Sequence, residues 1–322
     1  MNKRVLFRLN AGEKYGWGHF SRSHALAYLL KEVNILFFLN ADCKEIINRK
    51  LDKSIHAIYI LNEDDFFKHI KPNDIVILDG YEFIETYRNK VKAKCKRLIC
   101  IEDLPNGHYT CDAILNCADD AKKQYYSADK HTRFFFGYEY ALLNNVFFEP
   151  ILNTERYGVV ISMGSLDPYN ITTTILKALL NQSYTLPIHV IYTDYFNLNQ
   201  QQFIEKVASE NKINAYKNLT ALEIKNLMDK SQFGIFPTSN VLLEALKRQV
   251  TCAFGYFVDN QIPNYQSFTE LNVGFPLGKL TDVLWNDVLV NFFETTKTNA
   301  HLFADIIGSK IYELKSFILH GN

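Results

Sequence analysis

The sequence predicts an α/β protein with two Rossmann-like domains that face a cleft. Apolar runs of strand length alternate with helical patterns, which favours βαβ units and mainly parallel sheets. The alternation restarts after residue 157, and 322 residues suffice for two cores, because single cores seldom grow much beyond about 250 residues. We expect a domain over residues 1–150, a second over 151–303, and a helix over 304–322 that packs back on the first domain.

The first half alternates from its start. Apolar runs predict strands at 5–10, 34–40, 57–61, 74–81 and 97–103, with further strands or strand ends in 112–118 and 133–143. Helical patterns cover 18–31 and 42–51. The polar stretch 149–157 contains Pro150 and several charges, which is typical of a linker.

The second half repeats the scheme without repeating the sequence. Strands, some with a turn, are expected at 158–168, 186–194, 233–239 and 251–257. Helices are expected at 170–182, 222–231 and 240–250, with a further helix beginning within 260–272 and two more after residue 282.

Composition excludes several classes of protein. Lysine plus arginine equals aspartate plus glutamate, at 35 each, and no basic cluster with interleaved aromatics is present, so we expect no nucleic-acid partner. The six cysteines form no CxxC pair, which indicates reduced thiols in a cytoplasmic protein. The first residues lack a signal-like apolar region and no run reaches the length of a membrane span, so we expect no stable membrane insertion.

The unusual polar and glycine-rich stretches follow the predicted strands. They occupy residues 16–19, 79–81, 102–103, 163–167 and 238–240. In open parallel sheets, ligands bind beyond the carboxyl ends of the strands, so a site is expected there. Loops are polar in any protein, so the position of these residues does not by itself identify a site.

The first such stretch, GWGHFS, joins a strand to a helix. Gly16 and Gly18 suit a tight turn, but Ser21 replaces the third glycine of a dinucleotide motif and Asn40 stands where a ribose-binding acid is expected, so nicotinamide binding is disfavoured. His19 falls at the first turn of the helix, where the dipole disfavours a charged imidazole. A neutral imidazole accepts protons, so His19 is either a general base or a capping histidine.

Two turns in the second half suit a nucleotide. Gly164 and Ser165 precede a helix, where free backbone amides can hold a phosphate, and Asp167 can cap that helix or accept a hydroxyl hydrogen bond. Ser239 and Asn240 open another helix, and Glu244 one turn later can accept hydrogen bonds from a ribose diol. Each turn is also compatible with an ordinary capped helix, and their combination favours a nucleotide.

These motifs, in this order, resemble one enzyme family. The segments GWGHFSR, ILDGYEF, IEDLPNGHYTCDAILN, FGYEYALL, SMGSLDPYN, SNVLLEAL and DNQ look like those of the UDP-2,4-diacetamido-2,4,6-trideoxy-β-L-altropyranose hydrolases of pseudaminic acid biosynthesis, from about residue 3 to 275. Those enzymes are similar to the two-domain GT-B glycosyltransferases. The family's Gly-x-Gly-His-x-x-Arg, Ser-x-x-x-x-Glu and Asn-Gln motifs carry over to Gly16, Gly18, His19, Arg22, Ser239, Glu244, Asn260 and Gln261. Its Met-Gly-Gly-Thr-Asp turn corresponds to Met163, Gly164, Ser165, Leu166 and Asp167, which lacks the second glycine and the hydroxyl residue. Its Asp-His-Tyr motif corresponds to Asp79, Gly80 and Tyr81, so the histidine is replaced by glycine.

The resemblance implies a metal-independent hydrolase without a cofactor that releases UDP from a UDP-activated amino sugar. His19 would take a proton from the attacking water, and Tyr81 would orient the sugar or the water. The other family residues, with Asn240, would bind substrate or nucleotide. Two alternatives remain: a GT-B glycosyltransferase, in which a hydroxyl replaces the water, and a non-catalytic sensor of sugar nucleotides, to which the glycine at position 80 points.

Overall fold

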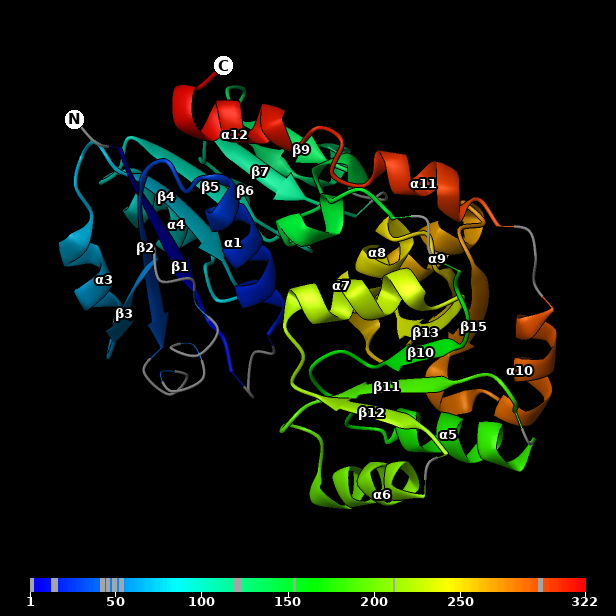
Figure 1. The fold of residues 1–322 in the computed structure, drawn as a ribbon. Coiled ribbons are helices and arrows are strands. Elements are labelled where there is room, and N and C mark those ends of the chain that lie inside the picture. The colour runs from blue at the N-terminus through cyan, green and yellow to red at the C-terminus, as the bar shows by residue number, and fades with distance from the viewer. Residues whose placement is uncertain are drawn as a thin grey trace. The chain divides into compact units, whose positions relative to one another are not determined.

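The computed structural model describes residues 3–12, 17–40, 44, 47, 51, 55–118, 123–152, 155–182, 184–210, 212–294 and 298–322. The chain divides into two compact units, an N-terminal unit of Met1–Asn145 with Gly308–Asn322 and a C-terminal unit of Val146–Ile307. Each unit has its own parallel sheet and its own helices (Figure 1). The α/β class with two Rossmann-like domains is therefore confirmed.

The sheet of the N-terminal unit has the strand order β3-β2-β1-β4-β5-β7-β9, and each pairing is parallel. Its central strands are buried almost throughout, as expected for a parallel sheet covered on both faces. The strands are β1 (Arg4–Leu9), β2 (Asn34–Asn40), β3 (His56–Ile60), β4 (Ile75–Asp79), β5 (Arg97–Ile101), β7 (Ala113–Asn116) and β9 (Arg133–Phe136), with a separate short pair, β6 (His108–Tyr109) and β8 (Ser127–Ala128).

Helices cover both faces of this sheet. The described helices of the unit are α1 (Gly18–Leu29), α3 (Glu63–His69), α4 (Glu85–Lys92) and α12 (Ile311–His320). The ring of Phe20 in α1 lies 6.3 Å from that of Phe37, whereas the ring of Phe66 in α3 lies 5.0 Å from that of Phe38. Phe37 and Phe38 are neighbours in β2 and point to opposite faces, so α1 and α3 lie on opposite sides. The helix expected at 42–51 falls largely outside the described residues.

The sheet of the C-terminal unit has the order β12-β11-β10-β13-β14-β15, again parallel. Its core contains Ile161, Val190 and Ile235, which belong to three adjacent central strands. The strands are β10 (Val159–Ser162), β11 (Ile188–Tyr192), β12 (Asn214–Lys217), β13 (Phe233–Pro237), β14 (Thr251–Tyr256) and β15 (Phe275–Lys279). The order brings the carboxyl ends of β10, β13 and β14 side by side.

The described helices of this unit are α5 (Ile171–Asn181), α6 (Leu198–Ser209), α7 (Ala221–Lys230), α8 (Asn240–Lys247), α9 (Ile262–Glu270), α10 (Trp285–Phe293) and α11 (Ala300–Ile306). Local chemistry sets two of their starts. Asn197 with Gln200 and Thr220 with Glu223 form capping boxes, which satisfy free backbone amides at the beginnings of α6 and α7.

The described residues at the end of the chain form three helices, α10 to α12, and the prediction of two helices is wrong. Gly308 adopts φ +71°, a conformation that suits glycine, and its amide donates to the carbonyl of Tyr138 in the N-terminal unit. In α12, Leu314 and Ile318 are buried, and Arg97 Nη1 donates to the Ile318 carbonyl at 2.6 Å. The last helix therefore belongs to the N-terminal unit.

Among the described helices, none has both the length and the apolar character that crossing a bilayer requires.

Candidate functional site

A charged cluster lies at the carboxyl edge of the N-terminal sheet. β1, β4 and β5 are adjacent, so the segments that follow them converge. The first two turns of α1 supply His19 and Arg22, the end of β4 supplies Asp79, and the loop after β5 supplies Asp103. Strand order thus brings together residues that lie 57 to 81 positions apart in sequence.

His19 is buried and its orientation is fixed by Asp79. The distance from His19 Nδ1 to Asp79 Oδ1 is 2.6 Å. Burial alone would raise the pKa of Asp79, but the charge of Arg22 holds that pKa well below its usual range. An ionised carboxylate only accepts hydrogen bonds, so we assign the proton to Nδ1, which leaves the lone pair of Nε2 available to accept a proton.

Arg22 joins the two carboxylates. Its Nε and Nη2 donate to the two oxygens of Asp79 at 2.9 and 2.6 Å, and its Nη1 donates to Asp103 Oδ1 at 2.5 Å. Burial would lower the pKa of Arg22, but the two carboxylates raise it well above its usual value. Two carboxylates and one guanidinium leave one net negative charge, which favours a positive charge on His19 after it accepts a proton.

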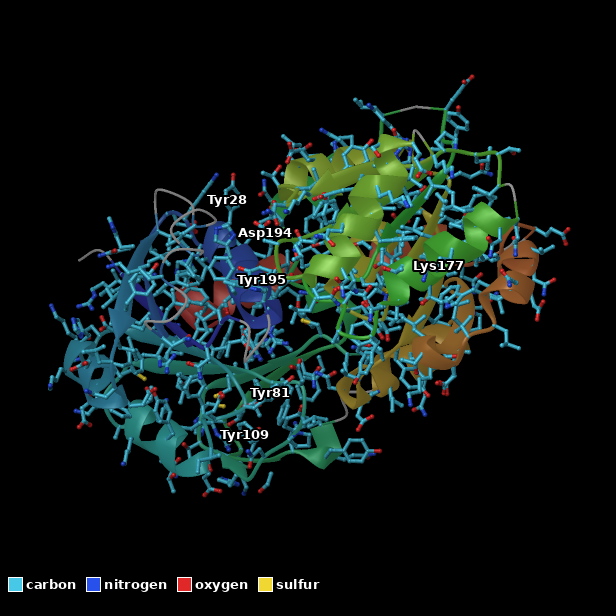
Figure 2. The ribbon with its side chains drawn as sticks, turned by 90° about the horizontal axis from the view of Figure 1, so that it is seen from below. Tyr28, Tyr81, Tyr109, Lys177, Asp194 and Tyr195 are labelled. Atoms are coloured by element: carbon cyan, nitrogen blue, oxygen red, sulfur yellow. The ribbon has the colours of Figure 1, made fainter. Side chains whose placement is uncertain are left out.

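Tyr81 completes the cluster. Its hydroxyl donates to Asp103 Oδ2 at 2.8 Å, and its ring meets that of His19 edge to face with centroids 5.1 Å apart. Tyr81 is 47% exposed, so a ligand can reach it. Its place in the molecule is labelled in Figure 2. The predicted pair of His19 and Tyr81 is therefore brought together.

Several residues of the cluster have roles that the sequence did not indicate. Asp79 and Arg22, predicted to bind substrate, are engaged with His19, Asp103 and each other. Ser23 also donates to Asp79, at 3.0 Å. The position of Asp103 after a buried strand was visible in the sequence, but its contacts with Arg22 and Tyr81 depend on strand order. Ser23 gave no signal.

The predicted glycines of the first turn are only partly described. Gly16 lies outside the described residues. Gly18 is the first residue of α1, and no described atom lies within 4 Å of the position that a side-chain Cβ would take. Packing in the described part of the chain therefore leaves room beside this helix start.

In the C-terminal unit, the turn after β10 also leaves space. Gly164 has φ +81°, and a Cβ there would meet no described atom within 4 Å. The carbonyl of the adjacent Ser165 accepts from Thr193 Oγ1 at 2.8 Å, which fixes the turn. A ligand can approach this backbone closely.

Asp167 caps a helix, one of its two expected roles. It is buried, and its two oxygens accept from the amides of Ile171 at 2.9 Å and Thr172 at 2.8 Å. The carboxylate thus satisfies the first turn of α5.

Glu244 stands out on the helix that begins after β13. Ser239 precedes this helix without a capping hydrogen bond from its side chain, and Asn240 and Glu244 share one face of it. Desolvation raises the pKa of Glu244 to about 8. Within the described residues, its carboxylate has no hydrogen-bond or ion-pair partner. A partly buried acid in this state is available to a ligand that supplies donors.

The turn after β14 is tied to the turn after β13. Thr238 Oγ1 donates to the carbonyls of Gly255 at 3.1 Å and Gln261 at 3.3 Å. Gln261 Oε1 accepts from the amide of Phe257 at 3.0 Å, and the neighbouring Asn260 is exposed. Asn260 and Gln261 therefore lie beside the turn that carries Ser239 and Asn240.

The described residues contain no cluster of three or more histidine, cysteine, aspartate or glutamate side chains placed to hold a metal ion.

The fold is that of the GT-B glycosyltransferases and epimerases. Arabidopsis thaliana UGT89C1 complexed with UDP has a TM-score of 0.65 and 11% identity, and the match covers 98% of this chain and 99% of that one. A UDP-glucosyltransferase from Polygonum tinctorium has a TM-score of 0.58 and 9% identity over 98% and 94% of the two chains. A putative UDP-N-acetylglucosamine 2-epimerase from Listeria monocytogenes has a TM-score of 0.57 and 12% identity over 100% and 98%.

Among particular proteins, the UDP-2,4-diacetamido-2,4,6-trideoxy-β-L-altropyranose hydrolase of Campylobacter jejuni is similar in sequence. It is 23% identical over 268 residues, which cover 80% of this chain and 93% of the relative, and it confirms the resemblance seen in the motifs. An uncharacterised protein of Methanocaldococcus jannaschii is 25% identical over 249 residues, 72% of this chain. The match spans only 51% of that relative. No protein-family model matches the chain.

Proposed function

We propose that this protein is a UDP-sugar hydrolase in which His19 activates water. The observation that carries the proposal is the buried contact of 2.6 Å between His19 and an ionised Asp79, which leaves Nε2 free to accept a proton. The resemblance to the Campylobacter jejuni hydrolase, over 80% of the chain, supports the same reaction.

The C-terminal unit would bind the nucleotide. The open backbone at Gly164 and Ser165 and the start of α8 at Ser239 and Asn240 suit the diphosphate. The ribose diol would donate to Glu244, whose carboxylate lacks a partner in the described structure. Asn260 and Gln261 would contact the sugar, as in the family that the sequence resembles.

In the reaction, the water oxygen forms a bond to the anomeric carbon while its proton passes to Nε2 of His19. The bond between that carbon and the β-phosphate oxygen breaks, and its electron pair leaves with UDP. The net negative charge of Asp79, Arg22 and Asp103 would stabilise the imidazolium. Exposed Tyr81, held by Asp103, would orient the sugar or the water.

For the sugar, the resemblance points to a diacetamido-trideoxy hexose, used in nonulosonic (pseudaminic) acid biosynthesis. Gly80 takes the place of the family's histidine, and a Cβ at this position would lie 3.0 Å from the Phe83 ring and 3.2 Å from Glu82. A larger side chain here would have to displace its neighbours. We therefore expect a sugar preference that differs in detail from the family's.

A glycosyltransferase is the second candidate, and the fold supports it, since a UDP-glucosyltransferase matches 98% of the chain in structure. The same base would then deprotonate a hydroxyl of an acceptor in place of water. The two reactions differ in whether UDP is released without an acceptor.

The test is UDP release from a panel of UDP-activated deoxy and acetamido sugars, without acceptor and with chelator present. The proposal predicts release from a diacetamido-trideoxy sugar nucleotide at a rate proportional to enzyme concentration. Binding of UDP without release from any substrate in the panel would contradict hydrolysis. Release that starts only when hydroxyl acceptors are added would establish the transferase.

A further inference from the structure

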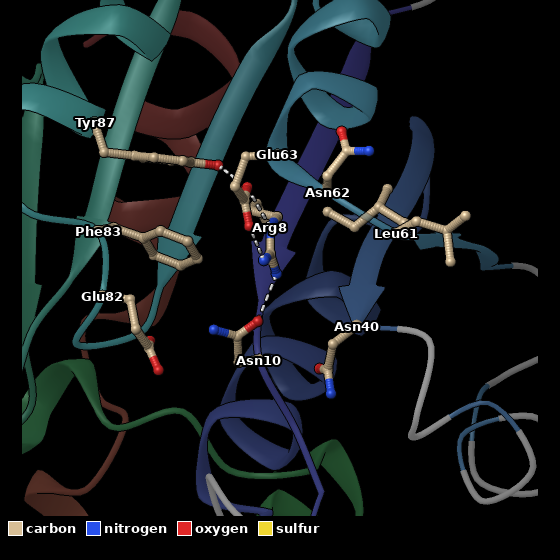
Figure 3. Close-up of a pocket in the computed structure, with 10 residues that line it drawn as sticks. Arg8, Asn10, Asn40, Leu61, Asn62, Glu63, Glu82, Phe83 and Tyr87 are labelled. Carbon is tan, nitrogen blue, oxygen red and sulfur yellow. Dashed lines mark hydrogen bonds and ion pairs between the residues drawn. The ribbon is translucent and has the colours of Figure 1, made fainter.

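A pocket lies in the N-terminal unit, away from His19. It has a volume of about 290 Å³, near the lower end of small-molecule pockets, and Figure 3 shows its lining. The lining residues come from the ends of β1, β2 and β3, from the start of α3, and from the start of α4 and the loop before it: Arg8, Asn10, Asn40, Ile60, Leu61, Asn62, Glu63, Glu82, Phe83 and Tyr87.

The pocket and the His19 cluster lie on opposite faces of the sheet. Arg8 and Leu6 alternate with Phe7 along β1, and Leu6 packs in one core with Leu78 and Phe83. Asp79 follows Leu78 in β4 and therefore points to the other face, where it holds His19. The proposed hydrolysis does not use this pocket.

An unusual ion pair forms one wall. Arg8 is 3% exposed and its guanidinium pairs with both oxygens of Glu63, which also accepts from the hydroxyl of Tyr87 at 2.5 Å. The same strand face continues inward with apolar residues, so the fold alone does not require a charge here. Arg8 is buried whereas the Glu63 side chain is 40% exposed, so this wall presents a charged edge that a ligand can reach.

Most polar groups of the pocket lining already form hydrogen bonds within the protein. Asn40 exchanges two hydrogen bonds of 3.1 Å with the backbone of Ala11, and Asn62 caps α3. Asn10 accepts from Arg8 at 2.9 Å through its oxygen. In Figure 3 the amide nitrogen of Asn10 points away from Arg8, toward the side where Glu82 lies.

Two groups are left for a ligand. The described residues provide no partner for the amide nitrogen of Asn10 or for the carboxylate of Glu82. Because Arg8 and Glu63 cancel, Glu82 leaves the lining with one net negative charge, which opposes phosphate and other anions. A donor, an acceptor and the edge of a buried aromatic residue, Phe83, together suit a ligand with hydroxyl groups on a compact ring.

We propose that this pocket binds a neutral, hydroxyl-rich ring of monosaccharide size, with its vicinal hydroxyls donating to Glu82 and accepting from Asn10. The inference goes beyond the proposed function, since it requires neither UDP nor turnover. It makes the N-terminal unit a carbohydrate-binding unit in its own right.

The experiment measures binding of free neutral monosaccharides, including glucose and N-acetylglucosamine, by saturation-transfer NMR and calorimetry at millimolar concentration. Glucosamine and inorganic phosphate serve as cationic and anionic probes. Wild type is compared with Glu82→Gln, with His19→Asn, and with Asp64→Asn, which removes an exposed carboxylate from α3 outside the pocket lining.

The proposal predicts that a neutral sugar binds, that Glu82→Gln weakens it about tenfold, and that Asp64→Asn and His19→Asn leave it unchanged. The tenfold loss corresponds to a hydrogen bond to a charged group. Absence of sugar binding, or equal binding by Glu82→Gln and Asp64→Asn, would overturn it. Binding only of glucosamine or only of phosphate would overturn it as well.

Discussion

At the level of single residues, the proposed role of His19 as the base depends on Asp79. The carboxylate fixes the proton on Nδ1 and leaves Nε2 as the acceptor. Because Asp79 also binds Arg22 and Ser23, it connects the base to the rest of the cluster. Changes at these positions therefore separate chemistry from nucleotide binding, for which we propose residues of the C-terminal unit.

Asp79→Asn is expected to lower kcat by about 10²- to 10⁴-fold, because an amide can donate to Nδ1 and leave the proton on Nε2. UDP affinity, measured by calorimetry, should stay within a few-fold. Turnover within twofold of wild type would show that the carboxylate does not set the imidazole proton.

The same variant has a pH signature in stability. The folded-state pKa of Asp79 is depressed, so its ionisation stabilises the native state above its unfolded-state value, 3.8, and this contribution is lost as pH falls through the folded-state value. The melting temperature of wild type should therefore exceed that of Asp79→Asn near neutral pH and approach it in acid. A constant difference across the range would contradict the ion pairing seen here.

Tyr81→Phe tests the exposed end of the cluster. Removing the hydroxyl breaks its bond of 2.8 Å to Asp103, and we expect kcat to fall about tenfold, the equivalent of one hydrogen bond. The melting temperature should not change, since the side chain is 47% exposed. Tyr312→Phe, at an exposed tyrosine in α12, is the control. Equal kinetics of the two variants would exclude Tyr81 from the reaction.

At the level of elements, helix α8 contains Glu244, whose desolvated carboxyl group is costly to ionise. The folded-state pKa of Glu244 is raised to about 8 from an ordinary value of 4.5, with desolvation as the cause. Between these values the unfolded chain binds fewer protons than the native one, so stability falls as pH rises. The burial of Glu244 therefore costs the folded C-terminal unit stability above the ordinary pKa of the carboxyl group.

Glu244→Gln should remove the loss of stability that the buried carboxyl group causes as pH rises. Its melting temperature relative to wild type is expected to rise from pH 5 to 8 and then level off, because both states are ionised above that point. UDP affinity should fall about tenfold, through loss of charged hydrogen bonds to the ribose. Glu270→Gln, an exposed acid in α9, is the control. A difference in melting temperature between Glu244→Gln and wild type that does not change with pH would contradict a buried, neutral Glu244. Unchanged UDP affinity would show that Glu244 does not bind the nucleotide.

The final helix α12 stabilises the N-terminal unit. Phe317 is 6% exposed, and its ring lies 5.3 Å from that of Phe135 and under the guanidinium groups of Arg97 and Arg133. Phe317→Ala should cost about 3 to 5 kcal/mol, whereas Tyr312→Ala, 70% exposed, should change stability by less than about 0.5 kcal/mol. Fluorescence of Trp17 in a Trp285→Phe background reports on this unit. Equal effects of the two changes would contradict the docking of α12.

Sequence patterns predicted the buried elements better than the peripheral ones. The apolar runs of β1, β2, β4, β5 and β10 are strands as expected, since inner parallel strands are apolar throughout. The patterns missed β12 and β15, the two edge strands of their sheet, because one is short and polar and the other contains Pro276 and Gly278. Helices α3, α4 and α6 were also missed; α3 and α4 bury few residues.

For the whole molecule, the division into two units separates the proposed roles. Sequence placed the site at strand ends and singled out His19, Tyr81 and Glu244. It could not show the contacts of Arg22 with Asp79 and Asp103, because these depend on the order β1-β4-β5, which no local pattern encodes. The N-terminal unit would supply the base, and the C-terminal unit the nucleotide contacts.

The measurement that tests this account most directly compares UDP release and UDP binding in His19→Asn with those in His301→Asn, which alters an exposed histidine in α11. We predict that His19→Asn abolishes release while UDP binding stays within a few-fold, because losing a proton acceptor affects the transition state and spares ground-state binding. His301→Asn should match wild type in both. Continued release by His19→Asn, or loss of its UDP binding, would contradict the assignment of His19 as the base.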